Sequence, residues 1–384
     1  MKIIYGCANC SESKYEQLNT GSVQPAQKYH RLMMIGLASC GADVYCYSGL
    51  PINRNVTKKL FICEKDEVED GVKYHYYRTV NLSLFRQAMI LLGAKKAVKK
   101  HKKTADFVIC DCLNRANATG MASVANKNKI PVIMIVTDLP DYQFDQATAE
   151  KYNELLSKAD GYIFLTEQMN ERVNKSGKPY IVLEGHSDCA LNEIASGERY
   201  EEKTGKKVIV YAGSIKKLYG IQTLVEGFLK ANIKDAELQI FGDGDYREEL
   251  EEICKTNPTV KYMGVRPNGE VVAVEQRSAL LVNPRPSAPE YTKYSFPSKN
   301  MEYMASGTPI LTTKLPGMPK EYYPYIYAIE NESVDGVADA LKSVFADDYA
   351  KRTEKGKLAR EFVLNEKSNR VQAQKIIKFL KENF

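Results

Sequence analysis

The sequence lacks the segments that would place it across a membrane or among disulfide-rich secreted proteins. No apolar run approaches the roughly 20 residues that a transmembrane helix requires. Nine cysteines occur without a secretory leader, which indicates a reducing compartment where they remain thiols. Only four histidines occur, and none lies with cysteines at a spacing typical of structural zinc. We therefore expect neither a membrane-spanning protein nor a zinc module.

One pair of cysteines, Cys7-x-x-Cys10, has the spacing of a redox motif. The helix start and the cis-proline that accompany such motifs cannot be recognised around it. We therefore expect no redox activity at this pair.

Length and composition predict a soluble protein of two domains. The chain has 384 residues, more than the size at which one hydrophobic core usually stops growing. Apolar residues make up 44% and charged residues 27%, which are ordinary proportions for a globular protein. The net charge of +6 is mild, so the places where charge gathers say more about partners than the total does.

Strands and helices alternate through the first half of the chain. Residues 72–77 are interpreted as irregular. The alternation predicts a parallel sheet with helices on both faces, and ligands of such sheets bind beyond the carboxyl ends of the strands. That rule points to Asp138 and to residues 184–188, while Gly21 is either a close-approach glycine or a plain turn glycine. The predicted strands are 2–6, 43–47, 107–111, 132–136, 161–165 and 180–184, and the predicted helices are 24–40, 116–126 and 147–157.

A second alternation follows a polar stretch over residues 187–206, which we interpret as an interdomain linker because it has no periodic pattern. Asp243 and Asp245 flank a glycine and are interpreted as a turn that opens an acidic helix rather than as a metal site. A last helix over 371–384 carries an apolar stripe and must pack on another element. Its stripe consists of Ile376, Ile377 and Leu380. The predicted strands are 208–211, 238–241, 260–263 and 279–283, and the predicted helices are 219–231 and 246–254.

The segment from Ser295 to Gly307 predicts a short helix that binds a nucleotide. Ser295 is expected to cap it, Pro297 suits its first turn, and Gly307 can adopt the left-handed conformation that ends it. The free N–H groups of the first turn and Lys299 together favour a phosphate. Glu302, one turn further, can accept hydrogen bonds from the vicinal hydroxyls of a ribose. An ordinary amphipathic helix on a sheet is the alternative.

Residues 82–103 combine an apolar run with a cluster of lysines, which suits a surface helix on anionic lipid. Nucleic acid is disfavoured because no stacking aromatic residues interleave with the lysines. A solvated helix end is the remaining alternative. The cluster consists of Lys95, Lys96, Lys99, Lys100, Lys102 and Lys103.

Three motifs of the second half resemble those of GT-B glycosyltransferases, and most closely those of glycosyltransferase family 4 from bacterial capsule and exopolysaccharide synthesis. They are Tyr211-Ala212-Gly213-Ser214 with Tyr219-Gly220, then Phe241-Gly242-Asp243-Gly244, and finally residues 295–309. The resemblance implies an α/β protein of two Rossmann-like domains facing a central cleft, with the C-terminal helix crossing back to the first domain. The implied boundaries are 1–187 for the acceptor-side domain, 188–365 for the nucleotide-sugar domain and 366–384 for the helix.

The resemblance also implies the chemistry. The expected reaction is transfer of a sugar, with retention of configuration and without a bound metal or other cofactor, from a UDP- or GDP-linked donor to a saccharide or lipid-linked acceptor. We expect the enzyme in the cytoplasm, attached to the inner membrane face. A non-catalytic GT-B scaffold or partner subunit is the alternative, and a sugar-nucleotide epimerase is a less favoured one.

The chain departs from the family pattern at four positions. The family's Glu-x7-Glu motif retains its second glutamate, Glu302, but its first falls on Tyr294. The arginine and lysine that neutralise the diphosphate fall on Ser214 and Tyr219, and the histidine near the donor falls at about Asp138. Four other cations are candidates to replace the missing charge, because the leaving diphosphate needs cationic or amide donors. These are Lys216, Lys217, Arg285 and Lys299.

The candidate site follows from the helix and the resemblance together. We expect Asp138, Lys299 and Glu302 to take part in catalysis. The expected donor-binding residues are Gly21, Gly213, Ser214, Lys217, Gly242, Arg285, Tyr294, Ser295, Phe296, Pro297, Ser298, Lys299 and Glu302.

Overall fold

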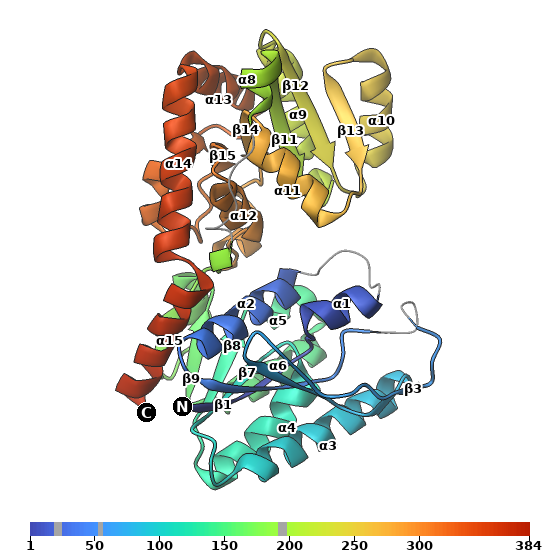
Figure 1. Cartoon of the computed structure of the whole chain (residues 1–384), viewed down its shortest axis with the longest axis vertical. Helices are drawn as coiled ribbons and strands as arrows, with labels where there is room; N and C mark the ends of the chain where they lie inside the picture. Colours follow the sequence, from blue (N-terminus) through green and yellow to red (C-terminus); the bar gives the residue numbers. More distant parts are fainter. Residues whose placement is uncertain (19–24, 53–56, 191–197) are drawn as a thin grey trace. The chain divides into compact units, whose positions relative to one another are not determined.

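The structure is a computed structural model, and it describes residues 1–18, 25–52, 57–190 and 198–384. The chain divides into two compact units (Figure 1). Unit 1 contains Met1–His186 together with Ser368–Phe384, and unit 2 contains Ser187–Lys367. The last segment of the chain therefore returns to the first unit.

Unit 1 is built on a sheet whose described strands follow the order β10-β9-β8-β7-β1-β2-β5-β4. Neighbouring strands are parallel except for β4 and β5, which are antiparallel. Every residue of β7 and β8 is buried, as expected for central strands covered on both faces. The strands are β1 (Lys2–Cys7), β2 (Asp43–Ser48), β4 (Glu67–Glu69), β5 (Val72–Tyr76), β7 (Phe107–Asp111), β8 (Val132–Val136), β9 (Gly161–Phe164) and β10 (Tyr180–Val182), and a separate antiparallel ribbon joins β3 (Phe61–Ile62) to β6 (Thr79–Val80).

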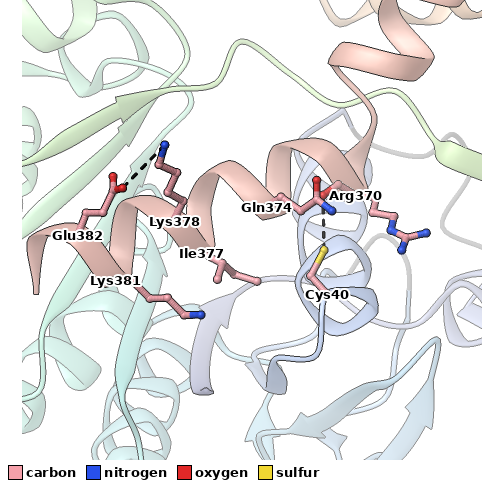
Figure 2. Close-up of a pocket in the computed structure, with 7 residues that line it drawn as sticks. All are labelled: Cys40, Arg370, Gln374, Ile377, Lys378, Lys381 and Glu382. Atoms are coloured by element: carbon pink, nitrogen blue, oxygen red, sulfur yellow. Dashed lines mark hydrogen bonds and ion pairs between the residues drawn. The ribbon is translucent and has the colours of Figure 1, made fainter.

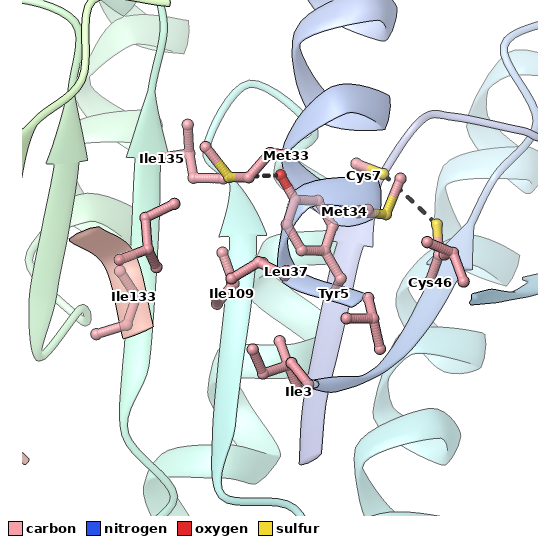
Figure 3. Packing of buried hydrophobic residues seen from close by; sticks show 14 of the residues in the cluster. Ile3, Tyr5, Cys7, Met33, Met34, Leu37, Cys46, Ile109, Ile133 and Ile135 are labelled. Carbon is pink, nitrogen blue, oxygen red and sulfur yellow. Dashed lines mark hydrogen bonds between the residues drawn. The ribbon is translucent and has the colours of Figure 1, made fainter. Parts of the chain in front are cut away.

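Helices pack against this sheet and bury its apolar side chains. Figure 3 shows Leu37 of α2 beside Ile109 of β7 and Met34 of the same helix toward Cys7 and Cys46, all in one buried cluster. The helices of unit 1 are α1 (Glu12–Leu18), α2 (Pro25–Ser39), α3 (Ser83–His101), α4 (Arg115–Ala125), α5 (Pro140–Gln143), α6 (Gln146–Leu156), α7 (Glu167–Val173) and α15 (Asn369–Asn383).

The C-terminal helix α15 packs on α2, and its predicted apolar stripe lies in the core of unit 1. Ile376 and Leu380 are fully buried there, while Ile377 is partly buried against the same cluster. The Sγ of Cys40, just after α2, donates to the carbonyl oxygen of Arg370 over 3.6 Å, as Figure 2 shows. The expected return of this helix to the first domain is confirmed.

Unit 2 contains a parallel sheet whose described strands follow the order β13-β12-β11-β14-β15-β16. Its two faces bury separate apolar clusters. The strands are β11 (Lys207–Ala212), β12 (Ala236–Phe241), β13 (Val260–Gly264), β14 (Leu280–Asn283), β15 (Ile310–Thr313) and β16 (Tyr327–Ile329). The helices are α8 (Tyr200–Thr204), α9 (Ile221–Ala231), α10 (Arg247–Thr256), α11 (Asn268–Arg277), α12 (Ser298–Ser306), α13 (Val334–Ala346) and α14 (Tyr349–Glu366).

Three local expectations are wrong. Residues 72–76 form a strand, β5, rather than an irregular segment. The linker region contains α8, because the Glu202 carboxylate accepts the Arg199 N–H and Gly205 ends the helix at φ 70°. Ser295 does not cap α12, which begins at Ser298 with Pro297 at the cap position. Residues that precede a proline avoid helical conformation, so the chain stays extended until Pro297.

Candidate functional site

Two glycine loops meet at the carboxyl edge of the unit 2 sheet. The Gly213 N–H, just after β11, donates to the Phe241 carbonyl oxygen at the end of β12 over 3.0 Å. Gly242 has φ +129°, and a Cβ there would lie 1.8 Å from the Gly213 carbonyl oxygen. Only glycine fits so close an approach of two backbones. The predicted glycine positions therefore form one surface of exposed backbone beside the strand ends.

Helix α12 is fixed to the same edge by polar side chains on its buried face. The Tyr303 hydroxyl accepts the Ala212 N–H at 2.8 Å and lies 3.1 Å from the Ala212 carbonyl oxygen. The Asn283 amide at the end of β14 donates to Asn300 over 2.6 Å. No side chain in the described part of the chain caps the helix. Its amino end therefore offers N–H groups and the positive dipole end beside the end of β14, at the carboxyl edge of the sheet.

Lys299 and Glu302 lie together on the first turns of this helix. Their side chains form an ion pair with 3.3 Å between Nζ and Oε2, and they are 32% and 16% exposed. Both groups are thus held in one partly buried place, where a phosphate would draw the ammonium away from the carboxylate. The sequence predicted this adjacency.

Arg285 lies between two tyrosine rings after β14. The centre of its guanidinium lies 4.9 Å from the Tyr219 ring centroid and 5.1 Å from that of Tyr291. Its Nε is buried and has no hydrogen-bond partner among the described residues. Gly220 has φ +78°, and a Cβ there would lie 2.3 Å from the Pro284 carbonyl oxygen, so the Tyr219 loop contacts the backbone that carries Arg285. Cation–π contacts of this kind hold a guanidinium in place without neutralising it.

The other candidate cations are less well placed. Lys217 forms an ion pair with Glu249 of α10, and its N–H donates to the Asp245 carboxylate over 2.8 Å. Lys216 lies 5.8 Å from the Tyr219 ring centroid. Of the four candidate cations, Arg285 is held in place by two rings, and its buried Nε–H has no hydrogen-bond partner among the described residues.

The remaining predicted donor residues are divided between surface and core. The Phe296 ring is buried against Tyr322, with 5.0 Å between ring centroids, so only its backbone can face a ligand. Ser295 Oγ is buried without a hydrogen-bond partner in the described chain, whereas Ser214 and Ser298 are exposed. Tyr294 and Pro297 lie in the segment directly before α12.

Unit 1 carries polar residues at the carboxyl edge of its own sheet. Asp138 follows β8 as predicted, while Gly21 lies outside the described residues. Asp111, the last residue of β7, lies 3.5 Å from Nε2 of the buried His30, whose Nδ1 lies 2.7 Å from the Tyr5 hydroxyl. Sequence reasoning missed His30 and Asp111. The position of Asp111 at a strand end was the signal that could have found it.

His186 lies beside this group. Its ring centroid is 4.5 Å from that of Tyr29, and neither ring nitrogen has a hydrogen-bond partner in the described parts of the chain. Burial, together with the smaller effect of the nearby His30, lowers the pKa of His186 to about 3. The imidazole is therefore neutral at physiological pH.

Helix α3 exposes apolar side chains next to the β3–β6 ribbon. Ile90, Ala94 and Val98 are buried on one face, whereas Leu84 and Phe85 on the other are 85% and 66% exposed. The Asn81 N–H donates to the Leu60 carbonyl oxygen over 2.7 Å, which ties the ribbon to the start of the helix. We call Leu60, Phe61, Leu84, Phe85 and Leu92, all exposed, the apolar patch. No helix in the described ranges is apolar and long enough to span a bilayer.

Comparisons with known proteins agree on one fold. Residues 195–381 match the family described as "Glycosyl transferases group 1". Sucrose-phosphate synthase from Thermosynechococcus elongatus is 16% identical at a TM-score of 0.70, covering 100% of this chain and 98% of that one. HepE from Anabaena, in complex with UDP, is 15% identical at a TM-score of 0.70, covering 100% of both chains.

A glycosyltransferase from Rickettsia africae is 15% identical at a TM-score of 0.68, covering 99% of this chain and 98% of that one. HepE has also been solved with UDP-glucose. No curated protein sequence matches the chain. At these identities the likeness to solved structures shows a shared fold.

Proposed function

We propose that this chain, which has the GT-B fold, is a nucleotide-sugar glycosyltransferase that transfers a sugar with retention of configuration to a saccharide or lipid-linked saccharide acceptor in bacterial surface polysaccharide synthesis. The family 4 resemblance of residues 211–214, 241–244 and 295–309 supports retention and this biosynthetic role. UDP and GDP are the candidate donor nucleotides.

The donor site is proposed at the carboxyl edge of the unit 2 sheet. One observation carries it: the uncapped amino end of α12, with Lys299 and Glu302 on its first turns, lies at the end of β14, and the same helix contacts Ala212 just before Gly213. Helix amino ends and exposed backbone N–H groups bind phosphate, and a carboxylate one turn further can accept both ribose hydroxyls. Arg285 would face the diphosphate.

The chemistry is proposed to rest on positioning and charge. The bond between the anomeric carbon and the diphosphate oxygen breaks, the acceptor oxygen bonds to that carbon, and the acceptor proton passes to the departing phosphate. Arg285, Lys299 and the dipole of α12 would stabilise the charge that develops on the diphosphate, with no metal or bound cofactor required. Asp138 is proposed on the acceptor side.

We further propose that the enzyme works in the cytoplasm on the inner membrane face, with residues 82–103 lying on anionic lipid. Phe85, Leu92, Lys96 and Lys99 follow one another at helical spacing on the exposed face of α3, and Lys103 is exposed just beyond the end of the helix. The apolar patch would enter the headgroup region while the lysines contact anionic headgroups.

A thermal-shift screen tests the donor proposal. The full chain is heated with UDP, GDP, their glucose and galactose conjugates, and ATP as a control. A ligand that binds only the folded state raises the melting temperature. We expect a shift with one nucleoside diphosphate series and not with ATP. No shift with any of them would contradict the donor site, and binding without sugar transfer or donor hydrolysis would favour the scaffold alternative.

A further inference from the structure

We propose that a groove in unit 1 between α5, α6 and α7 binds a pyranose unit of the acceptor saccharide, an inference that rests on the proposed glycosyl transfer. The groove has a volume of about 540 Å³. That size lies within the range of roughly 300 to 1,000 Å³ that is common for small-molecule sites. It begins at Leu139 and Pro140, directly after the proposed acceptor-side residue Asp138.

The groove has an apolar floor and a polar rim. Leu139, Leu156 and Tyr162 form the floor and are at most 3% exposed. Asn153 and Ser157 of the α6 end stand exposed at the rim. A pyranose ring has the same division, because its C–H faces are apolar and its hydroxyls project at the ring edge.

An ion pair crosses the rim and supplies directional hydrogen bonds. Arg172 of α7 donates to the Asp141 carboxylate of α5 over 2.8 Å, and the two side chains are 39% and 36% exposed. The carboxylate can accept a hydrogen bond from one sugar hydroxyl, and the guanidinium can donate one to the neighbouring hydroxyl. A hydroxyl can both donate and accept, so the pair can bind two adjacent hydroxyls. The pair as a whole is neutral, which suits an uncharged ligand.

The surroundings disfavour an anion. Helices α6 and α7 end at Leu156 and Val173, so the groove is lined by helix carboxyl ends, where the dipole is negative and carbonyl oxygens point outward. The Lys175 ammonium, which also lines the groove, donates to the Glu171 carbonyl oxygen at the carboxyl end of α7 over 2.7 Å, so it is directed toward this helix end. A neutral polyol that donates hydroxyl protons fits these groups better than a phosphate or a nucleotide does.

Methyl NMR on the full chain tests the inference. Protein with labelled Ile, Leu and Val methyl groups is titrated with methyl α- and β-glucopyranosides, methyl α- and β-galactopyranosides, maltose and cellobiose. We expect the methyl signals of Leu139, Leu156 and Val173 to shift with at least one of these sugars. Asp141→Asn and Arg172→Gln should each weaken that binding roughly tenfold, the equivalent of one hydrogen bond to a charged group.

Glu154→Gln is the matched control. Glu154 is an exposed acid on α6 that pairs with Lys158 over 2.8 Å and does not line the groove, so its loss should leave sugar binding unchanged. Unshifted methyl signals at the three positions with every sugar would overturn the inference, and so would equal weakening by Glu154→Gln. UDP and GDP shifts measured on the unaltered chain separate the two proposals: nucleotide shifts without any sugar shift reject the groove alone, and the absence of nucleotide shifts rejects the donor site.

Discussion

Gly36 of α2 lies directly against the backbone of Asn369, the first residue of α15: a Cβ at position 36 would lie 2.2 Å from the Asn369 carbonyl oxygen. The Asn369 side-chain amide also donates to the Leu32 carbonyl oxygen over 3.3 Å. The two helices are thus joined at backbone distance at the point where α15 begins. This contact makes the last helix part of the first unit's core although almost the whole chain separates them in sequence.

Deleting the residues after Asn369 is expected to destabilise unit 1. The deletion exposes the surface that Ile376 and Leu380 cover, and burying each such side chain stabilises by about 1.5–3 kcal/mol. Hydrogen exchange on the truncated protein should show lost protection in α2 and β1, and little change in α9 and β12. Unaltered protection throughout residues 1–185 would show that the packing of α15 does not stabilise unit 1.

Arg285→Gln is expected to weaken UDP binding by roughly 10- to 100-fold, because charge-assisted hydrogen bonds contribute about 1.5–3 kcal/mol. Uridine lacks the diphosphate, so its affinity should not change. Arg285→Lys should restore part of the loss, and Lys255→Gln on the exposed face of α10 is the control for charge alone. Isothermal calorimetry measures all of these. Equal losses for UDP and uridine would assign Arg285 a structural role instead.

Glu302→Ala is expected to weaken uridine and UDP alike, because the carboxylate is proposed to hold the ribose that both contain. The loss should be about tenfold or more for two hydroxyl hydrogen bonds to a charged group. Glu270→Ala on the exposed side of α11 is the matched control. Unchanged calorimetric affinity with an intact fold would remove Glu302 from the donor site.

Periodic segments of the fold could be predicted from the sequence, and short or tertiary features could not. The stripe of Ile376, Ile377 and Leu380 is visible as a 3.6-residue period, so the docking of α15 was foreseeable. The close approach at Gly36 was not, because no local pattern marks a glycine that contacts a distant helix. Strand β5 was missed although Val72, Tyr74 and Tyr76 alternate with Lys73 and His75, because a run of five residues is a weak signal and its pairing with β2 is a tertiary feature.

The candidate site was predictable to a similar degree. Gly213, Gly242 and the α12 segment stand out because phosphate-binding loops need glycine and a helix amino end. The contacts of Arg285 with Tyr219 and Tyr291 could not be predicted, because these residues lie on loops that come together only in the folded sheet. The cap of α12 was misplaced by two residues, at Ser295 instead of Pro297, because the residues before a proline avoid helical conformation.

The apolar patch and the lysines of α3 are expected to bind vesicles that contain anionic lipid. Binding of the full chain to phosphatidylcholine vesicles with phosphatidylglycerol should fall as salt rises. The double change Lys99→Gln and Lys100→Gln should weaken it roughly 30-fold, at about 1 kcal/mol per lysine. Leu84→Ser with Phe85→Ser should also weaken it, whereas Leu358→Ser, an exposed leucine of α14, should not. Equal sedimentation with neutral and anionic vesicles would argue against attachment by charge.

His186 is expected to make unit 1 less stable as the solution becomes acidic. Its pKa is about 3 in the folded chain, below the value near 6.5 of an unfolded histidine, so only the unfolded state takes up the proton between these pH values. Above pH 6.5 both states are neutral and His186 adds no pH dependence. Below it the free energy of unfolding falls by about 1.4 kcal/mol per pH unit, which amounts to about 2 kcal/mol between pH 6.5 and pH 5.

His186→Leu should remove this part of the pH dependence, and it should also raise stability at pH 7 because it replaces two buried nitrogens that lack hydrogen-bond partners in the described chain. Urea unfolding followed by circular dichroism at pH 7 and pH 5 gives the difference between the two proteins. Taking the difference between the two proteins cancels the titration of distant carboxylates. The titratable neighbours that could respond to the substitution are Glu184, His30 and Tyr29. If the leucine variant loses stability between pH 7 and pH 5 as steeply as the unaltered chain, the imidazole of His186 is not the group that titrates.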